Sequence, residues 1–145
     1  MQKANPEFQA AVESAPTTEE IEQVRQGLRD YNLRYAPADG YQPLNVLLRA
    51  VDGSVCGGLL GETYWGWLHI DILWVDDAAR SQGYGSHLLE LAEDEARRRG
   101  CHAIHLDTMS FQARPFYETH GYTVFGILND LPAGHSRIFL EKVLI

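Results

Sequence analysis

Residues 75–86 read Val-Asp-Asp-Ala-Ala-Arg-Ser-Gln-Gly-Tyr-Gly-Ser. An apolar run that predicts a strand precedes this stretch, and a helical pattern over residues 83–99 follows it. A glycine-rich turn between a strand and a helix is typical of a phosphate site, because the first amides of a helix lack intrahelical acceptors. Gly83 and Gly85 let that backbone approach a ligand, and Arg80 adds a positive charge. Taken alone, the pattern is also compatible with a plain structural turn.

The turn differs from two other nucleotide-binding motifs. In the dinucleotide fingerprint Gly-x-Gly-x-x-Gly, the third glycine would fall at Leu88. A P-loop needs Gly-Lys-Ser/Thr, which does not follow the turn. The sequence therefore predicts neither of these two sites.

The remaining chain alternates strand and helix patterns. Thr17 and Glu20 form a capping-box signature ahead of an apolar stripe at helical spacing. The expected elements are a short strand at 8–14, a helix at 18–35, strands at 44–51, 54–64 and 67–75, a helix at 83–99, a strand at 102–108, a short helix at 113–120, and strands at 122–128 and 136–143. This order predicts an α/β (α+β) fold, in which the first three strands after the long N-terminal helix form an antiparallel meander. We expect one domain over residues 1–145, with a ragged terminus at residues 1–7.

Composition narrows the classes of partner. The chain has 145 residues and a formal net charge of -8, which disfavours nucleic acids and anionic membranes and mildly favours cationic small molecules. No apolar run approaches the roughly 20 residues of a membrane span, and residues 1–10 do not read as a signal peptide. Cys56 and Cys101 fit no metal or redox motif and are expected to be reduced, as in a cytoplasmic protein.

Two charge patterns are interpreted structurally. Three acid–base pairs four residues apart are expected on the solvated side of the helix at 83–99, namely Glu93–Arg97, Asp94–Arg98 and Glu95–Arg99. His102 and His105 are three apart in a predicted strand, so they are expected on opposite faces and not in a shared metal site. No metal is expected elsewhere.

Two segments together resemble one protein family. Residues 75–86 resemble motif A of the GCN5-related N-acetyltransferases (GNAT), which is Arg/Gln-x-x-Gly-x-Gly/Ala after a strand. Residues 110–122, Ser-Phe-Gln-Ala-Arg-Pro-Phe-Tyr-Glu-Thr-His-Gly-Tyr, resemble motif B, usually Asn-x-x-Ala-x-x-Leu-Tyr-x-x-x-Gly-Phe. The common Asn is Ser110 here, so Ser110 or Gln112 would take over its contact. The resemblance covers about residues 8–143.

The resemblance implies a GNAT-like fold and an acetyl-CoA-dependent N-acetyltransferase. The fold would be a mixed, mostly antiparallel sheet with a splayed central strand pair and helices on both faces. The amides of residues 82–86 would hold the coenzyme A pyrophosphate, and the strand ending at residue 75 would pair with the pantetheine arm. The residues expected to contact the cofactor are Leu73, Trp74, Val75, Arg80, Gln82, Gly83, Tyr84, Gly85, Ser86, Ser110, Gln112, Phe116 and Tyr117.

The implied reaction is direct attack of a primary amine on the thioester. Tyr117 is the predicted general acid for the departing thiolate, although it could instead be a core aromatic. Some family members carry a Glu near the middle of the strand before motif A, and the resemblance places His69 at that position. His69 oriented by Asp71, which shares its strand face, or either residue acting through water, is the predicted base. His69 could equally be a half-buried sheet residue, and Glu62 is a weaker candidate.

The acceptor side is less defined. The predicted substrate is the amine of a small cationic molecule, and aromatic side chains would suit such a group. The candidates are Tyr31, Tyr35, Tyr41, Trp65, Trp67, Phe125 and His135. Two alternatives stay open: a non-catalytic coenzyme A-binding regulatory module, and a protein or peptide N-acetyltransferase. The resemblance also allows a homodimer through the C-terminal strands.

Overall fold

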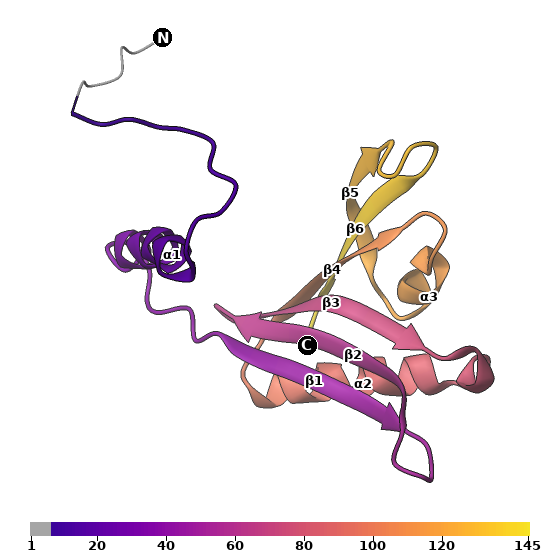
Figure 1. Ribbon diagram of the computed structural model, residues 1–145. Coiled ribbons are helices and arrows are strands. Elements are labelled where there is room, and N and C mark those ends of the chain that lie inside the picture. Colours follow the sequence, from indigo (N-terminus) through magenta and orange to yellow (C-terminus); the bar gives the residue numbers. More distant parts are fainter. Residues whose placement is uncertain (1–6) are drawn as a thin grey trace. The chain divides into compact units, whose positions relative to one another are not determined.

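The computed structural model describes residues 7–145, and the chain divides into two compact units at Ala38/Asp39 (Figure 1). The first unit contains α1 (Thr18–Asn32), which begins with the predicted capping box: the Thr17 hydroxyl accepts from the Glu20 amide, and the Glu20 carboxylate accepts from the Thr17 amide. The helix ends three residues earlier than predicted. The strand expected at residues 8–14 is wrong, because this segment has no neighbouring strand to supply a hydrogen-bonded ladder.

The second unit is a six-stranded sheet with two α-helices. Its elements are β1 (Gln42–Arg49), β2 (Val55–Tyr64), β3 (Trp67–Val75), the short 3-10 helix η1 (Asp77–Ala79), α2 (Tyr84–Arg98), β4 (Ala103–Met109), α3 (Arg114–Thr119), β5 (Thr123–Asn129) and β6 (Ser136–Val143). The strand order is β1-β2-β3-β4-β6-β5, and only β3 and β4 run parallel. The predicted mixed, mostly antiparallel sheet is confirmed, with each of these strands and α-helices within two residues of its predicted bounds.

The hydrophobic core lies between α2, α3 and one face of the sheet. Leu88 and Leu89 of α2 pack against sheet residues such as Leu68 and Leu106, and all four are at most 1% exposed. Burying one such side chain stabilises the fold by roughly 1.5–3 kcal/mol. None of the helices among residues 7–145 is both long and apolar enough to cross a membrane.

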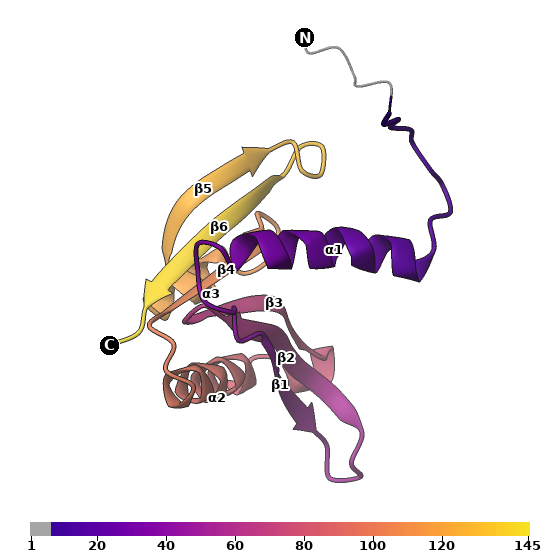
Figure 2. The same cartoon turned by 90° about the vertical axis from the view of Figure 1, so that its left-hand side faces the viewer.

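The central strands β3 and β4 separate halfway along their length. Their pairing runs from Trp67 opposite Ala103 to Ile70 opposite Leu106 and then stops, although β3 continues to Val75. Figure 2 shows β5 and β6 diverging from β1, β2 and β3. The splayed central pair is therefore confirmed.

A β-bulge accompanies the splay. Leu60 of β2 lies opposite Ile72 of β3, whereas the next residue, Gly61, lies opposite Ile70, so Asp71 is the extra residue. Bulges bend a strand and increase its twist. A Cβ on Gly61 would lie 2.2 Å from the His69 carbonyl oxygen, so the close approach of the two backbones requires glycine here.

The prediction that Glu93 lies on the solvated side of α2 is wrong, although its ion pair with Arg97 forms at 3.8 Å. Glu93 is only 6% exposed, and its carboxylate accepts from Lys142 Nζ at 3.0 Å and from the Tyr122 hydroxyl at 2.9 Å. The cause is tertiary, because β6 brings Lys142 to this face of the helix. Of the other predicted pairs, Glu95–Arg99 forms, whereas Asp94 and Arg98 each pair with a nearer residue, Arg97 and Glu95 respectively.

Candidate active site

The turn before α2 presents unsatisfied amides. Gly83 is the N-cap with a left-handed φ of 83°, and Ser81 is also left-handed at 62°. The first amide of the helix with a backbone acceptor is that of His87, which donates to the Gly83 carbonyl at 3.1 Å. Among residues 7–145, no acceptor is found for the amides of residues 82–86. This is the arrangement that an anion satisfies, and the helix dipole favours negative charge there.

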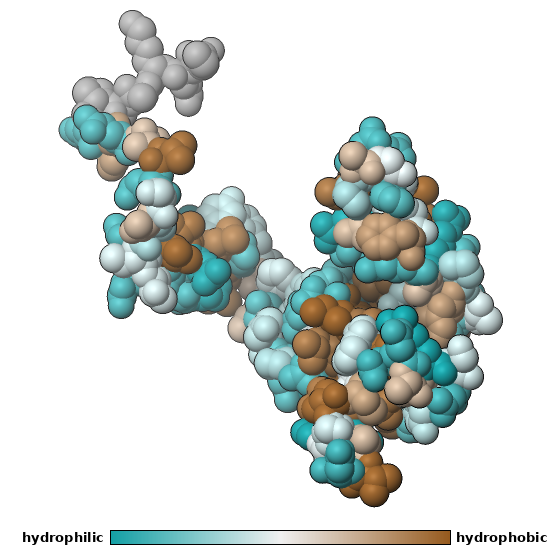
Figure 3. All heavy atoms as spheres, turned by 45° about the vertical axis from the view of Figure 1, so that its right-hand side comes forward, coloured by the Kyte–Doolittle hydropathy of each residue, from teal (hydrophilic) through white to brown (hydrophobic). Residues whose placement is uncertain are grey.

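Two connected cavities open beside this turn. The main cavity, about 610 Å³, is lined by residues 70–75, Arg80, Asp107, Thr108, residues 111–113 and Tyr117. The cradle cavity, about 490 Å³, is lined by Leu73, Val75, residues 79–81, residues 83–86, Ala113 and Phe116. They share Leu73, Val75, Arg80 and Ala113, so one groove leads from the turn into the splay. In the space-filling view of Figure 3, apolar side chains gather between the two parts of the sheet.

The side chain of Arg80 folds back across the turn. Its Nε donates to the Val75 carbonyl at 2.8 Å, and its guanidinium pairs with Asp77 at 2.6 Å. More than half of the side chain is exposed, at the junction of the two cavities. Arg80 therefore lines the same cavity as the residues with free amides, while its guanidinium contacts Val75 and Asp77.

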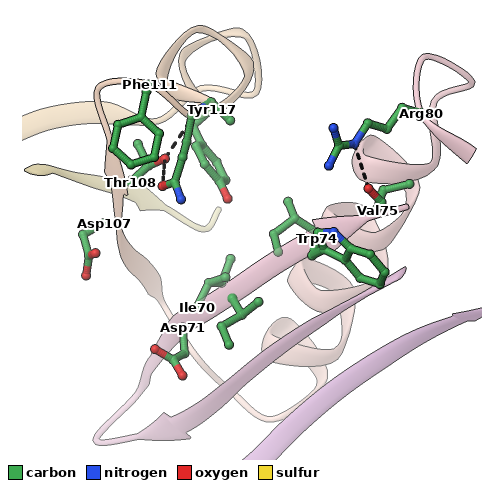
Figure 4. A pocket seen from close by; sticks show the side chains of 13 residues that line it. Ile70, Asp71, Trp74, Val75, Arg80, Asp107, Thr108, Phe111 and Tyr117 are labelled. Atoms are coloured by element: carbon green, nitrogen blue, oxygen red, sulfur yellow. Dashed lines mark hydrogen bonds between the residues drawn. The ribbon is translucent and has the colours of Figure 1, made fainter. Parts of the chain in front are cut away.

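Tyr117 lies at the wall of the main cavity opposite β3. It is 6% exposed and packs edge-to-face against Phe116 and Tyr122. Burial, and then the negative charge of Asp107, raise the pKa of Tyr117 to about 12. Figure 4 shows its hydroxyl pointing into the cavity, toward the wall formed by Trp74 and Val75. Tyr117 is thus a core aromatic whose polar end reaches the cavity.

The other predicted cofactor residues fall into two groups. Leu73, Trp74, Val75, Gly83, Tyr84, Gly85, Ser86, Gln112 and Phe116 line one or both cavities. Ser110 lines neither cavity, and its hydroxyl accepts from the Ser136 amide at 3.0 Å. Gln82 also lines neither, and its amide group donates to the Ala78 carbonyl at 3.2 Å. Of the two candidates for the position of the missing Asn, the structure brings only Gln112 to the groove.

A row of titratable side chains crosses the sheet face opposite α2. Glu62, His69, His105 and Glu141 are direct register partners on β2, β3, β4 and β6. His69 Nδ1 is 2.7 Å from Glu62 Oε1, and the two imidazoles stack with centroids 4.7 Å apart. Burial, and then the charge of His69, lower the pKa of His105. Among residues 7–145, no group of three or more His, Cys, Asp and Glu side chains could hold a metal ion.

The structure changes the predicted pairing of His69 with Asp71. Glu62 contacts His69, whereas Asp71 lines the main cavity and His69 does not. The reason is the bulge, which breaks the two-residue alternation of β3 at Asp71. Figure 4 shows Asp71 and Asp107 at the same end of the cavity, where the splay begins.

The prediction that His102 and His105 face opposite ways is also wrong. Both rings contact the Trp67 ring edge-on, at 5.5 and 5.7 Å. His102 precedes β4, which begins at Ala103, so strand alternation does not apply to it.

Sequence reasoning missed six residues that line the main cavity, namely Ile70, Ile72, Asp107, Thr108, Phe111 and Ala113. Asp107 makes a two-pronged ion pair with Arg137, both contacts at 2.9 Å. The only sequence signal for Asp107 was its place two residues beyond His105 on a strand that borders the predicted splay.

Comparison with known proteins identifies the family. The model of the acetyltransferase (GNAT) family matches residues 6–122. The chain belongs to the GNAT family. An acetyltransferase of Agrobacterium fabrum is 43% identical to this GNAT chain over 119 residues, covering 82% of it and 87% of the relative. Blasticidin-S acetyltransferase of Streptomyces morookaense is 40% identical over 116 residues, covering 77% and 85%.

Comparison with solved structures also gives acetyltransferases. A crystal structure of an acetyltransferase from Bacillus cereus matches the GNAT chain with a TM-score of 0.84 and 37% identity, over 92% of this chain and 98% of the other. A Bacillus anthracis protein solved in complex with acetyl coenzyme A matches with a TM-score of 0.63 over 77% of this chain and 65% of the other; at 19% identity it shows the fold alone. The chain is thus an N-acyltransferase, and the free amides and connected groove of this GNAT domain suit acetyl-CoA.

Proposed function

We propose that this enzyme transfers the acetyl group of acetyl-CoA to the primary amine of a small cationic molecule by direct attack. One observation carries the proposal. The Tyr117 hydroxyl and the Asp71 and Asp107 carboxylates face a single cavity at the point where β3 and β4 separate. A proton donor and an anionic, amine-attracting wall therefore meet at the end of the groove that starts at the free amides.

The donor side follows from the groove. The amides of residues 82–86 and the Arg80 guanidinium would hold the pyrophosphate, and residues 73–75 would lie along the pantetheine arm. When bound, acetyl-CoA supplies an activated thioester carbonyl and a thiolate leaving group. The chain itself must orient the amine, exclude water, and move two protons.

Tyr117 is suited to donate a proton to the departing sulfur. Because the pKa of Tyr117 is raised to about 12, its hydroxyl stays protonated at neutral pH. It faces the cavity from α3, opposite β3, along which the arm would lie. The O–H proton would pass to the sulfur as the carbon–sulfur bond breaks, and solvent would restore it.

The base is assigned to His69 together with Glu62. If Nδ1–H donates to Glu62, the other ring nitrogen is free to accept a proton, and Glu62 stabilises the imidazolium that forms. His69 lies two residues, about 7 Å, from Asp71 along β3, so a water molecule would carry the proton between them. Asp71 would then hold the ammonium form of the acceptor at the cavity.

The acceptor cannot be carried over from relatives by name. One relative is named for blasticidin S, and another, 32% identical over 91 residues, is an IAA acetyltransferase of Azospirillum brasilense. A cationic acceptor is instead supported by this chain: two carboxylates line the cavity, Asp107 is paired with Arg137, which also lies within electrostatic reach of Asp71, and the net charge is -8.

The test is a thiol-release assay with acetyl-CoA and a panel of cationic amines, neutral amines and peptides. We expect release with small cationic amines, and a fall in kcat of about 100-fold for Tyr117→Phe with coenzyme A affinity retained. Turnover of the variant that matches the native enzyme across pH would contradict the role of Tyr117. A preference for peptides, or binding of acetyl-CoA without release to any amine, would contradict the proposal itself.

A further inference from the structure

A third cavity lies on the sheet face opposite α2, where β3 and β4 are still paired. This distal pocket, about 300 Å³, is lined by Tyr64, Trp67, His105, Phe125 and Glu141. The five residues come from five strands: β2, β3, β4, β5 and β6, respectively. It is separate from the groove that leads to the free amides, because it shares no lining residue with either of those cavities.

The imidazole of His105 is fixed in this pocket. Its Nε2 is 2.8 Å from the Tyr64 hydroxyl, its ring meets the rings of Tyr64 and Trp67 edge-on, and it stacks on His69. Burial, and then the proximity of His69, lower the pKa of His105, which favours its neutral imidazole form. The pocket wall is therefore aromatic on this side, with its imidazole held by one hydrogen bond and by ring contacts.

Glu141 supplies the charge. It is the register partner of His105 on β6 and is exposed. Among residues 7–145 its carboxylate makes neither an ion pair nor a hydrogen bond, whereas Asp107, two residues along β4 from His105, is paired with Arg137. A lone carboxylate next to Tyr, Trp and Phe rings matches an organic cation, which gains both Coulomb and cation–π energy.

The strands set the distance between this pocket and the reacting amine. Asp71 and Asp107 mark the start of the splay. Trp67 lies four residues from Asp71 along β3, which is about 13 Å. His105 lies two residues from Asp107 along β4, which is about 7 Å. A molecule that reaches both places needs two polar ends about 7–13 Å apart.

We propose that the distal pocket binds a second positive charge on the acceptor, so the preferred substrate is a diamine, a polyamine or an amine that carries a guanidinium group. The inference rests on the proposed function, since it takes the acetylated amine to lie at Asp71 and Asp107. It specifies a second positive charge on the acceptor and its distance from the reacting amine, and the acetyl transfer itself requires neither.

The experiment measures binding and turnover together. Straight-chain diamines of increasing length and monoamines of equal length are titrated calorimetrically into the protein saturated with coenzyme A, and thiol release is followed with acetyl-CoA. Native enzyme should bind best the diamine whose nitrogens are about 10 Å apart. Glu141→Gln should lower the affinity for that diamine about fivefold and raise its KM by the same factor. The variant should leave kcat and the affinity for monoamines unchanged.

Glu90→Gln, an exposed carboxylate change on α2, is the matched control and should alter neither series. Equal affinity of native and Glu141→Gln protein for the diamines, or no preference for diamines over monoamines, overturns the subsite. The calorimetric arm keeps the two proposals distinct. If diamine binding depends on Glu141 but no thiol is released, the subsite stands and the proposed function falls.

Discussion

At the scale of single residues, two tyrosines of one core have different surroundings. Tyr117 ends at the main cavity, whereas the Tyr122 hydroxyl donates to the buried Glu93 carboxylate at 2.9 Å. Burial is the largest cause of the raised pKa in both residues, followed by Asp107 for Tyr117 and by Glu93 for Tyr122. The hydroxyl groups of both residues therefore bind their protons more tightly in the folded protein than in the unfolded chain.

This gives a prediction for alkaline stability. The pKa of Tyr117 rises from 10.0 to about 12 on folding, so the folded state binds the proton more tightly. The contribution to the free energy of unfolding is fully present below about pH 10 and is lost as pH rises through about 12, a change of about 2–3 kcal/mol. Urea unfolding at about pH 8 and about pH 11 should show a smaller loss of stability in Tyr117→Phe than in the native protein. An equal loss in both would contradict the burial of this hydroxyl.

A second prediction concerns Gly61. A Cβ at this position would lie 2.2 Å from the His69 carbonyl oxygen, so Gly61→Ala must push β2 and β3 apart. We expect a loss of about 3 kcal/mol or more in the free energy of unfolding. Gly126→Ala is the matched strand control, because its nearest neighbour would be Phe139 Cβ at 3.9 Å, an ordinary contact. Equal urea midpoints for the two variants would show that the bulge tolerates a side chain.

At the scale of elements, α2 is tied to its surroundings by one buried carboxylate. Glu93 joins the helix to Lys142 on β6 and to Tyr122 just before β5. Removing it leaves an ammonium group that is only 22% exposed without its partner.

Glu93→Ala should therefore cost about 3–5 kcal/mol in the free energy of unfolding, measured with urea. The exposed neighbour Glu90 provides the control, and Glu90→Ala should change stability by less than about 0.5 kcal/mol. The double variant Glu93→Leu/Lys142→Leu should recover much of the loss, since an apolar pair often replaces a buried ion pair at little cost. If the double variant is no more stable than Glu93→Ala, the loss comes from packing and not from the stranded charge.

The helices show why prediction from sequence succeeds in part. The capping box and the glycine that follows α2 are local signals. They predicted the start of α1 at Thr18, where it is observed, and the end of α2 one residue beyond the observed Arg98. The solvated side of α2 was misjudged at Glu93 because its partner, Lys142, is 49 residues away in the chain. Helical spacing cannot show that a distant strand delivers a counter-charge.

The candidate site likewise contains residues that local sequence signals predict and residues that depend on contacts between distant parts of the chain. The place of Gly85 and Tyr117 at the groove could be predicted, because it follows from local turns and a family resemblance. Asp107 and the His69–Glu62 contact depend on strand register and on a bulge. A single sequence gives alternation along a strand, but it does not give the point at which that alternation breaks.

At the scale of the whole molecule, charge sets a further prediction. The formal charge is -8, so an acceptor with positive charges approaches an attractive field. At saturating acetyl-CoA, kcat/KM for a diamine should fall severalfold between about 0.02 M and about 0.3 M salt, as screening shortens the reach of that field. A neutral amine such as hydroxylamine measured alongside should show little change. Equal salt dependence for both would mean that acceptor charge plays no part in recognition.

The bulge at Asp71 also bears on how the two substrates can be tuned. Before it, the odd-numbered residues Trp67 and His69 lie on the face away from α2; beyond it, Leu73 and Val75 pack toward the core and line the cradle cavity. One inserted residue thus shifts the phase of the strand, so under the proposed function a single segment of nine residues would serve the acceptor at one end and the donor at the other. In that arrangement, substitutions at the acceptor end would leave the coenzyme contacts in place, so the acceptor could change while the donor stays the same.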